Sequence, residues 1–313
     1  MSSKKPKDLQ KTRAILKIRA TALAACRSWL NSQDFTEVQG PVLLPAVGER
    51  PRSFEVNYFG KKAFLSEGLQ PYSDSFMEMF GQIYTVAPAF RAEPLKDNRH
   101  LAEFWRIEAA TLNSDLPEIM CTLEGLVSNC CSVLVRDNAE ELSQLSRLED
   151  LLLVKPPFSR ITYDEAIELL RKSGCLINWG EPLSREFERK LSLMFDKPFF
   201  VREFPVGGEN FLFKSSSERP ELSLCADLLA PGGLGEIAGC GEAIMSKKDL
   251  VGKLKEMQVE SADRRWFLGL RRFGDCPESG FSVGVERLVQ WLCGLQNVGD
   301  AVAFPRVYGR SYV

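Results

Sequence analysis

Near the start of the chain, apolar residues recur with the alternating three- and four-residue spacing that places them on one side of a helix. These residues are Ile15, Ile18, Ala22, Ala25 and Trp29. They predict an amphipathic helix over roughly residues 10–32. The next segment, FTEVQGPVLLP, contains Pro41, and because proline cannot continue a helix, we expect an extended segment there.

Two segments that alternate between polar and apolar residues predict neighbouring strands at residues 82–87 and 104–110, joined by a charged loop. Because successive side chains of a strand point to opposite faces, the second strand has two distinct sides. One side carries Trp105, Ile107 and Ala109, and the other carries Phe104, Arg106 and Glu108.

Capping-box signatures predict the starts of two further helices. In this motif, a polar side chain at the helix start and an acid three residues later each bond a free backbone N–H of the other. Asp115 with Glu118 forms the first signature, and Thr162 with Glu165 forms the second. The second helix is expected to stop at Gly174, because glycine tolerates the left-handed conformation that ends many helices.

From residue 199 onward the pattern returns to strands. They are expected at residues 199–204, 210–216, 221–230 and 235–240. Glycines then lead into a last helix within GFSVGVERLVQWLCG, which ends near Gly294. Several strand pairs are joined by turns too short for a parallel doubly wound sheet. We expect an α/β fold of the α+β kind, with a mostly antiparallel sheet flanked by helices in one principal domain.

The composition is that of an ordinary globular protein, with 44% hydrophobic and 26% charged residues. We expect no membrane association, because the chain has neither an apolar run of roughly 20 residues nor a secretory signal. Nine cysteines without a CxxC pair, and His100 as the only histidine, exclude a multi-histidine metal site and argue against a Ser–His–Asp hydrolase. Mostly buried, reduced thiols are typical of a cytoplasmic protein.

Charge is balanced over the whole chain but not at its start. The 40 basic and 42 acidic side chains leave a net charge of −2, which argues against indiscriminate binding of polyanions. Residues 1–11 nevertheless form a basic arm that contains Lys4, Lys5, Lys7 and Lys11. This arm fits either the solvated face of a helix or a contact to phosphate groups.

Residues on either side of the charged loop suggest a phosphate site. A strand is expected to deliver Arg91 and Glu93 to one face, because they are two residues apart. The chain then returns through Arg99 and His100 to Phe104. A guanidinium group offers a planar fork for phosphate, and a phenylalanine beside it can stack on a purine. A surface ion-pair network with a core phenylalanine explains the spacing equally well.

Two carboxylates and a glycine-rich run supply further candidates. Asp227 and Glu236 flank the turn at 230–235, which lets two oxygen donors approach a Mg²⁺ ion held jointly with substrate phosphates. Helix caps or solvated acids are the alternative for this pair. The run GFSVGVER places Gly284 before a helix and Arg287 in its first turn, where free backbone N–H groups favour an anion. A tight packing turn is the alternative for the run.

In this order, the segments resemble the three signature motifs of class II aminoacyl-tRNA synthetases. The extended segment ending in Pro41 is similar to motif 1, FRAE…RHLAEF to motif 2 and GVERLVQW to motif 3. Within the class, RHLAEFWRIEAA, DLLAPGGLGEIAG and GLQNVGDAVAFPR are similar to asparaginyl-tRNA synthetases. The resemblance covers roughly residues 12–308 and implies the class II synthetase fold, a homodimer built through motif 1, and the use of ATP and Mg²⁺.

The resemblance also implies roles for single residues in forming an aminoacyl-adenylate. Arg91 would hold the α-phosphate and the amino-acid carboxylate, and Arg287 the outer phosphates, so these two are the expected catalytic residues. Asp227 and Glu236 would hold Mg²⁺. The complete expected ATP site is Arg91, Glu93, Arg99, His100, Phe104, Glu236, Gly284 and Arg287. The amino-acid carboxylate attacks the α-phosphorus itself, so no protein nucleophile is expected.

The expected amino-acid pocket departs from the pattern of the family. Its candidate residues are Gln70, Asp74, Arg272 and Glu278. Gly68 stands where the family has a serine, and Asp74 stands where it has a glutamate. Glu278 replaces a histidine, and Ser73 stands where aspartate-binding relatives have a lysine. We interpret the ATP half of the site as intact and the amino-acid half as changed.

Residues 12–313 are expected to be a catalytic domain without the N-terminal OB-fold domain of the family, because a five-stranded barrel does not fit before the first helix. We favour ATP-dependent activation of asparagine or an analogue, followed by transfer to a non-tRNA acceptor, which makes the chain an amide-forming ligase. The alternatives are an asparagine–tRNA ligase, an asparagine synthetase-like enzyme and a catalytically silent regulatory paralogue.

Overall fold

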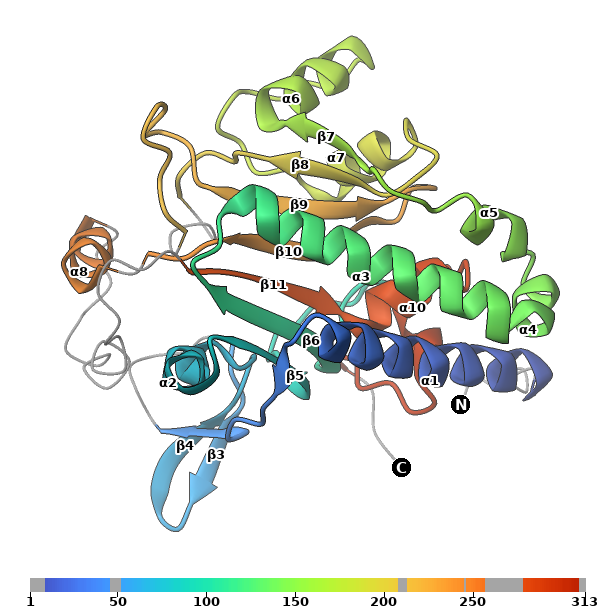
Figure 1. Cartoon of the computed structure of the whole chain (residues 1–313), viewed down its shortest axis with the longest axis horizontal. Coiled ribbons are helices and arrows are strands. Elements are labelled where there is room, and N and C mark those ends of the chain that lie inside the picture. The colour runs from blue at the N-terminus through green and yellow to red at the C-terminus, as the bar shows by residue number, and fades with distance from the viewer. Residues whose placement is uncertain (1–8, 46–51, 208–212, 245, 257–277, 310–313) are drawn as a thin grey trace.

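The fold is organised around a mostly antiparallel sheet (Figure 1). The structure is a computed structural model and describes residues 9–45, 52–207, 213–244, 246–256 and 278–309. Within these residues the sheet has eight strands, in the spatial order β1 (Thr36–Glu37), β5 (Gln82–Phe90), β6 (Glu103–Leu112), β11 (Glu278–Gly284), β10 (Gly235–Glu242), β9 (Cys225–Ala230), β8 (Phe199–Arg202) and β7 (Ser159–Thr162). In this described sheet only the outermost pairs, β1 with β5 and β7 with β8, run parallel. The expectation of a mostly antiparallel sheet flanked by helices is confirmed.

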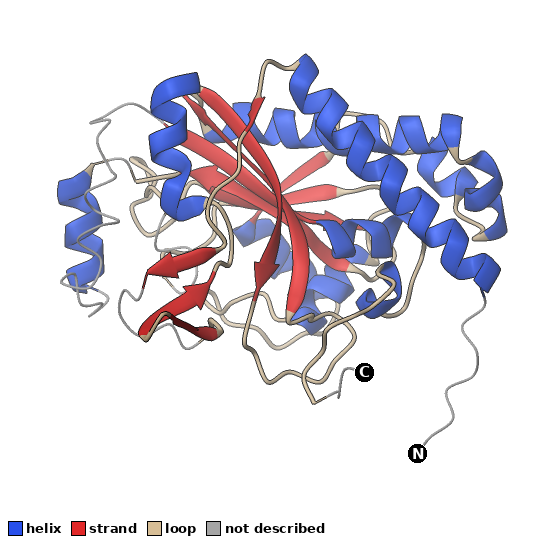
Figure 2. Ribbon diagram, turned by 90° about the horizontal axis from the view of Figure 1, so that it is seen from below, coloured by secondary structure: helices blue, strands red, loops and turns tan. Residues whose placement is uncertain are grey.

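A separate three-stranded antiparallel sheet lies apart from the main sheet, whose strong twist is visible from below (Figure 2). Its strands, in spatial order, are β2 (Leu43–Pro45), β4 (Lys61–Leu65) and β3 (Glu55–Tyr58). The extended segment expected around Pro41 is therefore divided between the two sheets, because β1 precedes Pro41 and β2 follows it.

The described helices are α1 (Leu9–Ser32), α2 (Gln70–Phe80), α3 (Leu116–Asp137), α4 (Ala139–Gln144), α5 (Leu148–Leu152), α6 (Tyr163–Lys172), α7 (Arg185–Ser192), α8 (Lys247–Glu256), α10 (Val285–Leu292) and the 3₁₀ helix η3 (Val298–Ala301). The predicted amphipathic helix is α1. Both predicted capping boxes are present: Asp115 caps α3, and Thr162 caps α6. Gly174 follows the end of α6 with a φ of 85°, as expected for a residue that terminates a helix.

One side of the main sheet, the back face, packs against α1 and α3, which lie side by side across it (Figure 1). This is the side that carries Ile107 of β6 and Val283 of β11, and both are fully buried. They pack in one core with Ile18 of α1 and Leu123 of α3, which are also fully buried. Burying one such side chain contributes about 1.5–3 kcal/mol. These contacts hold the two long helices on the sheet and leave its opposite side available for other residues.

Among the described residues, one helix is long and apolar enough to cross a membrane by its length and composition, and this helix is α3. Of its most apolar stretch, 56% is buried inside the protein. Core residues such as Ile119 and Leu126 make up this buried side. The place of α3 in the core therefore explains its apolar composition.

The two strands predicted at residues 82–87 and 104–110 are confirmed as the antiparallel pair β5 and β6, and both are longer than predicted. The strand predicted at 210–216 is wrong for its described part, since residues 213–216 form only isolated bridges. Lys214 donates its N–H to the carbonyl of Glu242 and accepts from the N–H of Leu224. The segment thus bridges residues of two separate chain segments instead of pairing along one of them. Residues 208–212 lie outside the described residues.

Candidate active site

The opposite side of the sheet, the front face, presents charged and small residues from four adjacent strands. Glu108 of β6 pairs with Ser282 of β11. Ser282 pairs in turn with Gly239 of β10, and Gly239 pairs with Asp227 of β9. Because directly paired residues of neighbouring strands share a face, these four residues form one row across the sheet. The row has a carboxylate at each end and small residues between them.

Two carboxylates lie close to Gly239, one of the small residues in this row. A Cβ atom built on Gly239 would lie 3.3 Å from Oδ1 of Asp227 and 4.0 Å from Oε1 of Glu236. The structure therefore brings together the two acids that flank the turn at 230–235. Among the described residues, no group of three or more potential metal ligands occurs. A pair of carboxylates fits Mg²⁺, which keeps several waters and is completed by substrate phosphates.

Glu236 links this acidic pair to the predicted catalytic arginine. Nη1 of Arg287 lies 2.8 Å from Oε2 of Glu236, and the stem of Arg287 lies over Gly284, with its Cβ 3.8 Å from the position of a Cβ there. Burial alone would raise the pKa of the Glu236 carboxyl. Guanidinium charges outweigh this effect and lower that pKa, and they belong to Arg287, Arg99 and Arg91. Two arginines from the segment between β5 and β6 and one from α10 therefore act on one carboxylate.

Arg99 reaches this group from the loop between β5 and β6. Its Nη1 and Nη2 atoms both lie 2.9 Å from Oε2 of Glu188 on α7, and Nη2 is 3.5 Å from the carbonyl of Glu236. His100 follows it, and its Nδ1 lies 2.7 Å from Oδ2 of Asp97. Burial would raise the pKa of Asp97, but hydrogen bonds from Arg99 and His100 lower it. A negatively charged Asp97 therefore holds the His100 ring in place next to Arg99 in the sequence.

Arg91 lies one residue beyond the end of β5, so the expectation that a strand delivers Arg91 and Glu93 to one face is wrong. The N–H of Arg91 still donates to the carbonyl of Ala102 at 2.9 Å, but the ladder of paired residues ends at Phe90. The guanidinium carbon of Arg91 lies 5.8 Å from the centre of the Phe104 ring, as the stacking hypothesis requires. Glu93 instead pairs with Arg52 at 3.5 Å.

Two charged residues of the site were given no role from the sequence. Arg106 and Glu108 follow Phe104 on the front face of β6, and the alternation of that strand was the signal that marked them. Glu108 lies beneath the segment before α2, where the N–H of Leu69 donates to Oε2 at 2.6 Å. A Cβ on Gly68 would stand 2.5 Å from Oε1 of Glu108. Glycine at position 68 is thus what allows this carboxylate to fit under the backbone.

Each arginine of the site has a glutamate within 4.0 Å. The pairs are Arg91–Glu67 at 3.9 Å, Arg99–Glu188 at 2.9 Å, Arg106–Glu108 at 3.2 Å and Arg287–Glu236 at 2.8 Å. Such pairs hold the guanidinium groups in place without substrate. An anionic phosphate can replace a carboxylate as the partner of a guanidinium group, and a cation can replace a guanidinium group as the partner of a carboxylate. We refer to these eight residues with Phe104 and Asp227 as the front-face site.

The residues predicted for the amino-acid pocket are placed only in part. Asp74 on α2 is 2% exposed and accepts a hydrogen bond from the hydroxyl of Ser73 at 3.3 Å. Glu278, 6% exposed, begins β11 and pairs with Leu112, four residues and roughly 13 Å along the strand from Ser282. Arg272 and the side chain of Gln70 lie outside the described residues. Recognition of the amino acid by these four residues therefore stays a prediction.

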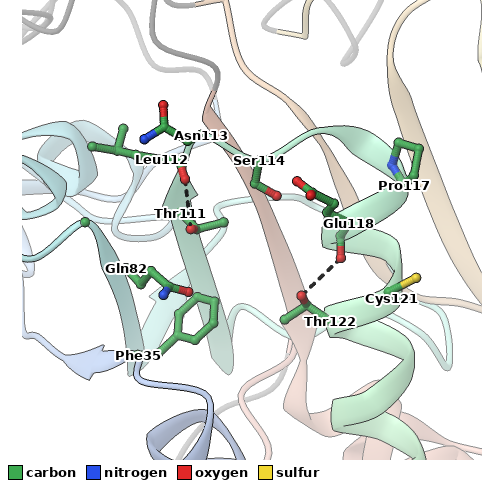
Figure 3. A pocket seen from close by; sticks show the side chains of 11 residues that line it. Phe35, Gln82, Thr111, Leu112, Asn113, Ser114, Pro117, Glu118, Cys121 and Thr122 are labelled. Atoms are coloured by element: carbon green, nitrogen blue, oxygen red, sulfur yellow. Dashed lines mark hydrogen bonds between the residues drawn. The ribbon is translucent and has the colours of Figure 1, made fainter.

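A hollow of 630 Å³ lies elsewhere, beside the start of α3 (Figure 3). Phe35, Thr111 and Thr122 line it, and Glu118, which also lines it, belongs to the capping box of α3. Thr111 alternates with the front-face residues of β6, so the hollow opens on the other side of the sheet. None of the predicted site residues lines it.

Comparison with solved structures identifies the class of the fold. Asparaginyl-tRNA synthetase from Pyrococcus horikoshii, complexed with asparaginyl-adenylate, matches with a TM-score of 0.93 and 37% identity, over 97% of this chain and 70% of that one. Asparaginyl-tRNA synthetase from Entamoeba histolytica matches with a TM-score of 0.86 and 29% identity, over 96% of this chain and 69% of that one. The fold is that of the class II synthetases, and the protein is an ATP-dependent ligase.

Comparison of sequences then gives the family. The model for "tRNA synthetases class II (D, K and N)" matches residues 8–308. The asparagine–tRNA ligase of Chloroflexus aurantiacus is 39% identical over 311 residues, which cover 96% of this chain and 71% of the relative. The chain belongs to the class II tRNA synthetase family of the D, K and N group, as an asparaginyl-tRNA synthetase-like core that activates an amino acid. The resemblance drawn from the three motifs is confirmed.

Proposed function

We propose that the chain activates asparagine or a close analogue by joining it to ATP as an aminoacyl-adenylate at the front-face site. One observation carries the proposal: Arg287 donates to Glu236 at 2.8 Å, and Arg91, nearly two hundred residues earlier in the sequence, helps to lower the pKa of the same carboxyl. The two predicted catalytic arginines therefore belong to one site. The complex of the Pyrococcus horikoshii relative with asparaginyl-adenylate supports the choice of amino acid.

The arrangement supports a mechanism that depends on positioning and charge. Arg91 holds the α-phosphate and the amino-acid carboxylate, and Phe104 stacks on adenine beside it. The carboxylate attacks the α-phosphorus, the bond to the β-phosphate oxygen breaks, and pyrophosphate leaves. Arg287 and His100 neutralise the outer phosphates as this charge develops. No side chain forms a covalent intermediate.

The remaining predicted ligands complete the nucleotide site. Arg99 supports the phosphate end, Gly284 leaves room beneath Arg287, and Glu93 contacts adenine. When bound, Mg²⁺ would neutralise phosphate charge, with Asp227 and Glu236 as its protein ligands. We assign residues 12–313 to the catalytic domain, with residues 1–11 as a basic arm.

We further infer a homodimer in the cytoplasm. The resemblance to motif 1 supports the dimer, and the eight described cysteines, which form no disulfide among themselves, support a reducing compartment. Light scattering tests the dimer directly, and a monomer at micromolar concentration would contradict the assignment of motif 1.

Two classes of acyl acceptor are candidates. Transfer to tRNA is favoured by the relatives, which are named asparagine–tRNA ligases and cover nearly the whole chain. Transfer to an acceptor other than tRNA, our hypothesis from the sequence, is favoured by the altered segment at Gly68 and Glu108, where a serine of the family would not fit. The relatives lend no support to this second acceptor.

Pyrophosphate exchange into ATP, measured with each of the 20 amino acids, tests the proposed function. Exchange dependent on asparagine is expected, and absence of exchange with every amino acid would overturn the proposal. Exchange dependent on aspartate would instead favour an asparagine synthetase-like reaction. Bulk tRNA and hydroxylamine are then offered to the adenylate in parallel, and acylation of tRNA would decide for the ligase named in the relatives.

A further inference from the structure

Arg106 is a charged residue of the front-face site to which no role has been given. Its Nη1 atom donates to the carbonyl of Glu67 at 2.9 Å and to Oε1 of Glu108 at 3.2 Å. Its guanidinium carbon lies 5.9 Å from the centre of the Phe104 ring, and that of Arg91 lies 5.8 Å from the same ring. Arg106 and Arg91 therefore share one aromatic neighbour.

Both of these hydrogen bonds use a single nitrogen of Arg106. Its Nε and Nη2 atoms have no hydrogen-bond partner within the described parts of the chain, and neither is among the buried atoms that lack one. These donors are therefore open to solvent, and the side chain is 24% exposed. A guanidinium group carries five N–H donors, so most of its binding capacity is available.

The group is also held in place. Glu108, its ionic partner, is fixed by the N–H of Leu69 at 2.6 Å and by the close backbone of Gly68. Across the sheet Arg106 pairs with Gly284, and the stem of Arg287 lies over that glycine. Arg106 thus shares the Phe104 ring with Arg91 and pairs with the glycine beneath Arg287, so it is a neighbour of both arginines that the proposed reaction uses.

We propose that Arg106 is a further substrate-binding residue, whose Nε and Nη2 atoms donate to an anionic oxygen at the reacting end of the substrates. This inference rests on the proposed function. The oxygen belongs either to the α-phosphate or to the amino-acid carboxylate, because the two meet there and a guanidinium fork suits both. The competing role is purely structural, in which Arg106 only ties the segment before α2 to β6.

The test compares Arg106→Gln with Arg106→Lys and with the control Arg136→Gln, whose side chain is 71% exposed and pairs with Asp137. Arg106→Gln is expected to lower kcat/KM for exchange by about 10²-fold, the usual effect of removing one preorganised donor from a developing charge. Arg106→Lys is expected to recover part of this loss, and Arg136→Gln to lose nothing.

Binding separates the two sources of the oxygen. If the α-phosphate is the partner, Arg106→Gln loses thermal stabilisation by AMP but keeps that by adenosine. If the carboxylate is the partner, AMP stabilises both proteins equally and KM for the amino acid rises. Wild-type kcat/KM and AMP binding in Arg106→Gln, even with a lower melting temperature, would overturn the proposal and leave the structural role.

If Arg106→Gln does not fold, Arg106→Lys tests the proposed contact instead, because lysine keeps a charged donor for Glu108 but lacks the planar fork. Wild-type behaviour of Arg106→Lys towards substrates would then reject the guanidinium contact. If the wild-type protein shows no exchange, the proposed function fails, while a dependence of AMP binding on Arg106 would still stand.

Discussion

The two faces of the main sheet have different physical roles, although the same strands form both. On the back face, Ile107 and Val283 are fully buried against α1 and α3. On the front face, the neighbouring residues Arg106 and Glu108 are charged, partly exposed and paired with each other. A strand alternates its side chains, so one segment contributes to the core and to the chemistry at once. Substitutions on one face are therefore expected to change stability, and those on the other to change activity.

Removal of Arg91 is the strongest test of the front face. Arg91→Ala is expected to lower kcat/KM for pyrophosphate exchange by about 10²–10³-fold, because a donor positioned for developing phosphate charge is lost. The melting temperature should change little, since Arg91 lies beyond the end of β5 and outside the core. Arg136→Ala, at an exposed ion pair, is the matched control. Exchange near the wild-type rate would mean that motif 2 is wrongly assigned.

Shortening a back-face side chain is the corresponding test of the core. Ile107→Ala removes buried methyl groups and leaves a cavity, which is expected to reduce the free energy of unfolding by about 2–5 kcal/mol. Urea denaturation measures this loss, and exchange assays on the folded protein should give an unchanged KM for ATP. A raised KM for ATP with wild-type stability would show that the two faces do not act separately.

Within the front face, the acidic pair Asp227 and Glu236 allows a separate test of the proposed metal site. Asp227→Asn is expected to raise the Mg²⁺ concentration for half-maximal exchange by about tenfold or more, since one of two charged ligands is lost. Asp137→Asn, at an exposed position, is the control. The measurement is a Mg²⁺ titration at saturating ATP, and an unchanged midpoint would remove Asp227 from the proposed metal site.

Substitution of Glu286, at the point where α10 joins the sheet, is expected to have the smallest effect, and this effect is on the pH dependence of stability. Burial raises the pKa of this carboxyl, although Arg19, 2.7 Å away, and the N–H of Trp105, 2.9 Å away, act in the opposite direction. Since the folded pKa is raised, the contribution of Glu286 to stability is complete below the ordinary glutamate pKa and is lost as pH rises through the folded pKa.

The free energy of unfolding of the wild type minus that of Glu286→Gln should therefore be larger in mild acid than at neutral pH. Urea denaturation of both proteins between pH 4.5 and 8 measures this difference, and the other titrating groups cancel in it. A constant difference across the range would show that the carboxyl titrates normally in the folded protein.

Local signals predicted much of the fold. The spacing of Ile15, Ile18 and Ala22 was sufficient for α1, and the capping boxes at Asp115 and Thr162 were sufficient for the starts of two helices. These features depend on neighbours within four residues. The strand predicted from local pattern at 213–216 was wrong, because the hydrogen bonds of this segment go to remote partners and do not form a regular ladder.

For the front-face site, too, the sequence predicted the residues that motifs mark and missed those that depend on remote contacts. Motifs identified Arg91, Asp227, Glu236 and Arg287, and the structure brings them together. Glu188 was missed, because nothing local on α7 shows that it faces Arg99. Glycine at position 68 was noticed only as a departure from the family, and its reason is Glu108, forty residues further along the chain.

The sequence by itself determined which residues share a face of a helix or strand, where helices begin and end, and which kinds of chemistry are available. These features follow from residue types at short spacing. The tertiary structure alone decided which charges meet. Strand register pairs Glu108 with Ser282 and Gly239 with Asp227, and a shift of one residue would turn each of these side chains to the opposite face. Register is set by the packing of the whole core, which no short segment contains.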